Sequence, residues 1–140
     1  MKKSLIFAFS FFLLASGVKA QSASADYKEA IALLKDKGYS ISTEQYAYLK
    51  EGETAYNMKT FYANLDYVVV AMSDDDNVND VDIYLYDDDG SEYAKDADSK
   101  SVAVLTVSPL VTRDMKVVIK NYSSSTPGTT SKCRFVIAYK

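Results

Sequence analysis

The feature that most constrains the fold is an apolar period of two that begins after Gly38 and continues to the end of the chain. Apolar and polar residues alternate, for example, over much of Ile41–Leu49 and over Val81–Leu85, and Cys133, Phe135, Ile137 and Tyr139 recur at every second position. This period places alternate side chains on one face of a β-strand. Turn sequences such as Asp87–Gly90 recur roughly every eight to twelve residues. The pattern predicts a mainly β protein, an antiparallel β-sandwich of about eight short strands.

Two segments add detail to this prediction. Tyr67–Met72 is apolar throughout and β-branched in its middle, which is typical of a central strand. Near the start of the chain, Tyr27, Ile31 and Leu34 recur at helical spacing, and Gly38 follows basic residues as it does at many helix C-termini. We therefore predict one N-terminal packing helix within residues 21–38 and a β-sandwich domain over residues 39–140.

Residues 1–20 have the pattern of a secretory signal peptide. Lys2 and Lys3 precede the apolar run Leu5–Leu14, and Val18 and Ala20 are small residues at the −3 and −1 positions of a cleavage site. The run of about ten residues is shorter than the roughly 20 that a membrane-spanning helix needs. We expect export without a membrane anchor, cleavage after Ala20, and a bacterial protein that is secreted or periplasmic.

Composition excludes several classes of function. The chain has no His and one Cys, so it has no Ser/His/Asp triad, no His-containing zinc or haem site and no internal disulfide. A net charge of −3 argues against nucleic acid as a partner. Paired carboxylates could hydrolyse glycosides, but the sequence singles out no pair, and we do not expect an enzyme. Cys133 alternates with Phe135 and Ile137, which favours a buried thiol over an intermolecular disulfide.

The order of elements resembles a known family. YVVVAMS at Tyr67–Ser73 is followed by an acidic loop and DVDIYLYDDDG, and strands reading VAVLTVSP and MKVVIKNYS come next. Over roughly Ile41–Tyr139 this order is similar to the bacterial pre-peptidase C-terminal domain. The resemblance implies a jelly-roll-like β-sandwich in a secreted, non-catalytic module. Members of that family often accompany secreted peptidases, some bind calcium, and some bind extracellular polymers such as collagen.

Acidic residues are concentrated between Ser73 and Asp98, where eleven acids accompany one base, Lys95. A hard cation with six to eight oxygen ligands would relieve the mutual repulsion of these carboxylates. One interpretation is a calcium site on this edge, for which the candidate ligands are Asp74, Asp76, Asp80 and Asp82. The other interpretation is a solvated acidic surface that keeps an exported protein soluble.

Tyr84 and Tyr86 are the candidate ligand-binding residues. They share a strand face with Asp80 and Asp82, opposite the apolar residues of the same strand. Partly exposed rings there would stack on sugars or peptides, or would serve cross-strand packing alone. We expect a secreted or periplasmic, non-catalytic binding module for an extracellular or envelope protein or polymer, with calcium as its candidate cofactor. The alternative is an acidic inhibitor or chaperone-like partner of a secreted peptidase.

Overall fold

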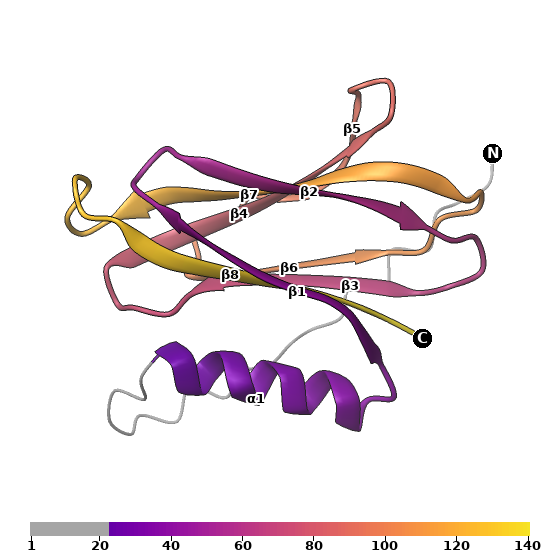
Figure 1. Ribbon diagram of the computed structural model, residues 1–140, viewed down its shortest axis with the longest axis horizontal. Coiled ribbons are helices and arrows are strands. Elements are labelled where there is room, and N and C mark those ends of the chain that lie inside the picture. The colour runs from indigo at the N-terminus through magenta and orange to yellow at the C-terminus, as the bar shows by residue number, and fades with distance from the viewer. Residues whose placement is uncertain (1–22) are drawn as a thin grey trace.

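The computed structural model describes residues 23–140, so the predicted signal peptide lies outside the described residues. The described chain forms one helix followed by strands (Figure 1). These elements are α1 (Ala23–Asp36), β1 (Ser40–Leu49), β2 (Thr54–Phe61), β3 (Tyr67–Ser73), β4 (Val78–Asp87), β5 (Glu92–Asp96), β6 (Val102–Val107), β7 (Arg113–Ser124) and β8 (Ser131–Tyr139). No helix within residues 23–140 is both long enough and apolar enough to cross a membrane.

The strands form two antiparallel four-stranded sheets that pack face to face (Figure 1). One sheet has the order β1-β8-β3-β6 and the other has the order β2-β7-β4-β5. The pairs β1–β8, β2–β7, β3–β6 and β4–β5 are those of a long antiparallel hairpin folded over on itself, which is the jelly-roll arrangement. The predicted jelly-roll-like β-sandwich is therefore confirmed. The sequence pattern did not locate β5, a short and polar edge strand.

The main core lies between the two sheets. Val81, Ile83 and Leu85 of β4 point into it and are at most 1% exposed. Cys133 and Phe135 of β8 face them from the other sheet, and the Cys133 thiol is fully buried. The alternation of the sequence thus marks the inner face correctly, and the prediction of a buried cysteine is confirmed.

A second apolar layer forms where α1 packs on the outer face of the sheet β1-β8-β3-β6 (Figure 1). Tyr27 and Leu34 of the helix contact a cluster that includes Val68, Val70 and Met72 of β3. Strand β3 is consequently buried on both faces, because its other side chains face the main core. Double-sided burial explains why Tyr67–Met72 is apolar throughout, and the prediction of a central strand is confirmed.

The turn between β1 and β2 is held by Asn121 of β7, which is completely buried. Its Nδ2 donates to the Leu49 carbonyl at 3.3 Å, and its Oδ1 accepts from the Ser124 hydroxyl at 3.0 Å. Its backbone carbonyl accepts from the Gly52 N–H at 2.7 Å, and Gly52 has the positive φ of 84° that this turn requires. These bonds tie the turn between β1 and β2 to the C-terminal part of β7.

Candidate functional site

The outer face of the sheet β2-β7-β4-β5 is uncovered by any element within residues 23–140, whereas α1 covers the other sheet (Figure 1). We use the name open face for one group of its outward-pointing side chains. They are Tyr56 and Met58 of β2, Lys116, Val118, Lys120 and Tyr122 of β7, and Tyr84 and Tyr86 of β4. Tyr56, Met58 and Tyr122 are 64%, 56% and 54% exposed. Large apolar and aromatic side chains are thus displayed to solvent on a regular sheet surface.

Strand register brings the open-face residues into cross-strand rows. Val118 of β7 lies between Tyr56 of β2 and Tyr84 of β4, so the two tyrosines flank it. Lysines stand over two of the rings: the Lys116 Nζ is 4.5 Å from the Tyr56 ring centre, and the Lys120 Nζ is 5.1 Å from that of Tyr122. Such cation–π contacts hold the rings and the ammonium groups together at the surface. The face therefore offers flat aromatic area with positive charge beside it.

The two tyrosines singled out from the sequence lie on the open face and are partly exposed, as expected. Their rings are nearly parallel, with centres 6.3 Å apart. The Tyr84 hydroxyl donates to Asp82 Oδ2 at 2.9 Å, and burial together with this bond raises the pKa of Tyr84 to about 12. The Tyr86 hydroxyl makes no hydrogen bond within residues 23–140. The Tyr84 hydroxyl is therefore engaged in a hydrogen bond within the protein, whereas the Tyr86 hydroxyl is available to a ligand.

The four candidate calcium ligands do not come together. Asp74 follows β3 and lies beside the other sheet, where the Arg134 Nε donates to its two carboxylate oxygens at 2.5 and 2.6 Å. The Lys132 Nζ is 3.6 Å from the same carboxylate. Two basic side chains already neutralise Asp74, so its charge does not call for a metal ion.

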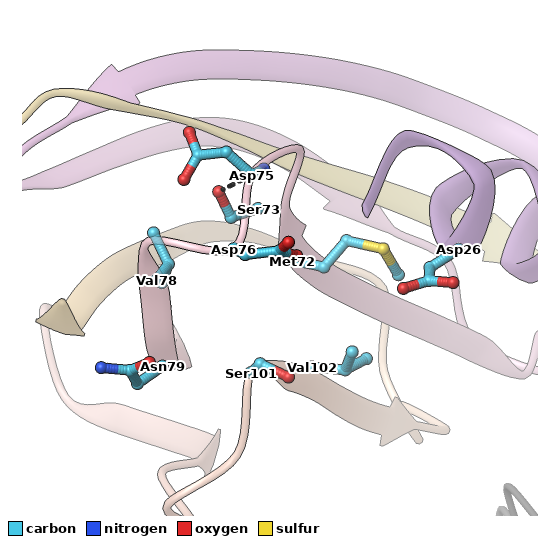
Figure 2. Close-up of a pocket in the computed structure, with 9 residues that line it drawn as sticks. All are labelled: Asp26, Met72, Ser73, Asp75, Asp76, Val78, Asn79, Ser101 and Val102. Atoms are coloured by element: carbon cyan, nitrogen blue, oxygen red, sulfur yellow. Dashed lines mark hydrogen bonds between the residues drawn. The ribbon is translucent and has the colours of Figure 1, made fainter. Parts of the chain in front are cut away.

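Asp76 lines a cavity of about 320 Å³ at the end of the sandwich where β3 connects to β4 (Figure 2). The cavity is lined by Asp26, Met72, Ser73, Asp75, Asp76, Val78, Asn79, Ser101 and Val102. The Asp75 N–H donates to the Ser73 hydroxyl, and Met72 extends toward Asp26 of α1 (Figure 2). These lining residues include three carboxylates and no base, but the carboxylates are spread along the wall and share it with apolar side chains.

Asp80 and Asp82 lie together on β4, separated by the core residue Val81. Unlike the exposed acids Asp75 and Asp88, they are buried, with exposed fractions of 8% and 2%. A solvated acidic surface therefore does not describe these two side chains. Asp80 Oδ1 is buried without a hydrogen-bond partner in the described part of the chain. Burial, followed by the nearby charges of Asp82, Asp98 and Asp96, raises the pKa of Asp80.

Asp96 and Asp98 are neighbours of this pair that the sequence pattern did not single out. Strand β5 runs back along β4, so Asp96 lies opposite Ile83, and the Val81 N–H donates to the Lys100 carbonyl at 2.9 Å. Recognition of β5 would have placed Asp96 beside β4, because the strand register pairs it with Ile83. Within residues 23–140, however, no three acidic or thiol side chains are gathered closely enough to hold a metal ion by themselves.

No protein-family model matches this chain, and no curated protein matches it. The open face and the buried carboxylates of β4 are the features of residues 23–140 that bear most directly on function.

Proposed function

We propose that the protein is a non-catalytic β-sandwich binding module, exported to the periplasm or the cell exterior, that holds an envelope or extracellular protein or polymer on its open face. The observation that carries this proposal is the exposure of Tyr56, Met58 and Tyr122 on one uncovered sheet surface. Contiguous exposed apolar surface on a monomer is typical of interaction sites. Tyrosine and methionine are also enriched where proteins bind partners.

The chemistry of the open face supports a polymer or an extended protein surface as the ligand. Tyrosine rings supply large, rigid contact area at a low entropic cost, because each has only two side-chain torsions. The ammonium groups of Lys116 and Lys120 lie beside the rings and can bind acceptor oxygens on the ligand. The exposed groups of the face are mainly aromatic rings and ammonium groups, which favours holding a ligand over transforming it.

Export, the family resemblance and calcium belong to the same proposal. The apolar segment of residues 5–14 supports export, and the jelly-roll order of strands is the fold that the resemblance to the pre-peptidase C-terminal domain implies. We propose calcium as the ion that stabilises the module, because the carboxylates of β4 are buried and crowded.

The test compares two pairs of exposed tyrosines. Tyr56→Ala with Tyr122→Ala removes two rings from the open face, and Tyr46→Ala with Tyr48→Ala removes two equally exposed rings from β1 in the other sheet. Binding of the purified protein to the envelope fraction and surface polymers of the producing organism is measured in calcium-containing buffer. We expect at least a tenfold loss of affinity for the open-face variant, because truncating central aromatic residues often costs 2 kcal/mol or more.

The β1 variant should bind like the wild-type protein. Equal losses in both variants would mean that the rings act non-specifically. Full binding by the open-face variant would remove the basis of the proposal.

A further inference from the structure

Asp80 stands out among the acids of the chain because a buried oxygen of its carboxylate has no partner. It is 8% exposed, and its Oδ1 accepts no hydrogen bond from the described residues. Buried polar atoms in folded proteins are nearly always hydrogen-bonded, and an uncompensated buried charge is more costly still. An oxygen in this state indicates that something outside the chain completes its environment.

The surroundings of Asp80 are negative. Asp82 lies two residues further along the same strand face, and the hydrogen bond from the Val81 N–H to the Lys100 carbonyl brings the segment after β5 alongside. Asp96 and Asp98 act on Asp80 from this segment. Two bases lie near: Lys100 is exposed and pairs with Asp98 at 2.9 Å, and Lys120 of β7 lies opposite Asp82 in the strand register. Within residues 23–140, however, no base forms an ion pair with Asp80. The missing component is therefore a cation.

We propose that a calcium ion binds at this end of β4, ligated by the carboxylates of Asp80 and Asp82 and by oxygens of the Asp96–Lys100 segment and water. Carboxylate and carbonyl oxygens are the ligands that calcium prefers, and calcium tolerates irregular geometry where Mg²⁺ demands an octahedron. Asp82 is already oriented by the hydrogen bond from Tyr84, as ligating carboxylates commonly are. Of the ligands expected from the sequence, this site retains Asp80 and Asp82 and omits Asp74 and Asp76.

The ligand set also predicts a weak affinity. No three acidic side chains in residues 23–140 are close enough to enclose an ion. Two carboxylates and several neutral oxygens must therefore coordinate the calcium ion together. Few charged ligands place the dissociation constant in the range of extracellular modules, roughly 10⁻⁴ to 10⁻³ M. Such a site fills outside the cell, where calcium is abundant. It specifies the calcium part of the proposed function and is independent of what the open face binds.

Thermal unfolding of the exported protein at neutral pH tests the site. For a dissociation constant near 1 mM, about 10 mM calcium should raise the melting temperature by about 5 °C, and NaCl of equal ionic strength should raise it much less. Asp80→Asn should lose the calcium-specific shift. Asp88→Asn, which alters an exposed acid of the β4–β5 turn, should keep it.

Terbium luminescence gives a second readout that does not depend on a thermal transition. Terbium replaces calcium and emits when a nearby tyrosine absorbs light, so Tyr84→Phe should lose most of the emission and Tyr46→Phe should not. Calcium should displace the ion. The site is overturned if calcium and sodium give equal shifts, if Asp80→Asn keeps the calcium shift, or if Tyr84→Phe emits like the wild-type protein.

The site would also be overturned if Asp80→Asn had a higher melting temperature than the wild-type protein and calcium had no effect on either. That result would mean that the Asp80 carboxyl is protonated in the folded protein and needs no cation. None of these results would affect the open-face proposal, whose readout is the binding of the Tyr56 and Tyr122 variant.

Discussion

Replacing Tyr84 with Phe removes one hydroxyl from the open face and leaves its aromatic ring in place. That hydroxyl donates to Asp82 Oδ2 at 2.9 Å, and the Asp82 side chain is 2% exposed. Hydrogen bonds to charged groups contribute about 1.5–3 kcal/mol to stability. Because Tyr84 is itself partly exposed, water can replace some of the lost bond, and we expect the low end, about 1.5 kcal/mol. This corresponds to a fall in melting temperature of about 6 °C.

Tyr86→Phe is the matched control. Its ring stacks beside that of Tyr84 on the same face, but its hydroxyl has no hydrogen-bond partner in residues 23–140. We therefore expect its free energy of unfolding to stay within about 0.5 kcal/mol of the wild-type value. Urea denaturation at pH 7 measures both variants, and equal m-values would show that the compared states expose the same surface. If the two variants differed by less than about 0.5 kcal/mol, the bond between Tyr84 and Asp82 would not stabilise the fold.

The remaining buried groups and the expected cleavage after Ala20 give further predictions. Asn121→Ala breaks two buried side-chain hydrogen bonds and should cost about 2–4 kcal/mol in urea denaturation, whereas Tyr122→Ala should cost less than about 0.5 kcal/mol. Burial raises the pKa of Cys133 to about 11, so a thiol reagent at pH 8 should label the unfolded protein and leave the native one unmodified; rapid native labelling would contradict this. In calcium-free buffer the free energy of unfolding should fall as the pH rises from about 3.8, the ordinary pKa of the Asp80 carboxyl, through its raised folded value, because the folded state holds the proton more tightly. Asp80→Asn should remove that part of the pH dependence. Intact-mass measurement should show an exported protein that begins at Gln21, and a full-length form would argue against cleavage.

Much of the fold could be predicted because the two-residue period reports directly which side chains face the core. Val81, Ile83 and Leu85 alternate in sequence and are buried together in the sandwich. Strand β5 escaped prediction because Glu92–Asp96 is an edge strand with little apolar surface. The two-residue period also does not predict which strands pair, because pairing depends on contacts between segments far apart in the chain. The resemblance to a known family, rather than the alternation, predicted the jelly-roll arrangement.

The candidate calcium ligands show what alternation does not reveal. Asp74 and Asp80 are close in sequence, but the chain crosses from one sheet to the other between them. Asp74 therefore meets Arg134, which is 60 positions away, whereas Asp80 meets the segment after β5. A run of acids looks uniform in sequence, and the crossing divides it into an ion-paired residue, exposed loop residues and a buried pair. Only the three-dimensional arrangement separates those roles.

The two sheets also differ on their outer faces in a way that bears on function. The outward residues of β3, Val68, Val70 and Met72, are fully apolar and lie beneath α1. Their counterparts on β4 include Tyr84 and Tyr86, which combine apolar rings with hydroxyls. Permanently covered surfaces resemble protein cores, whereas surfaces that must also face water are mixed in polarity. The mixed composition of the open face is therefore compatible with exposure to solvent, and it supports the proposed reversible binding of a partner there.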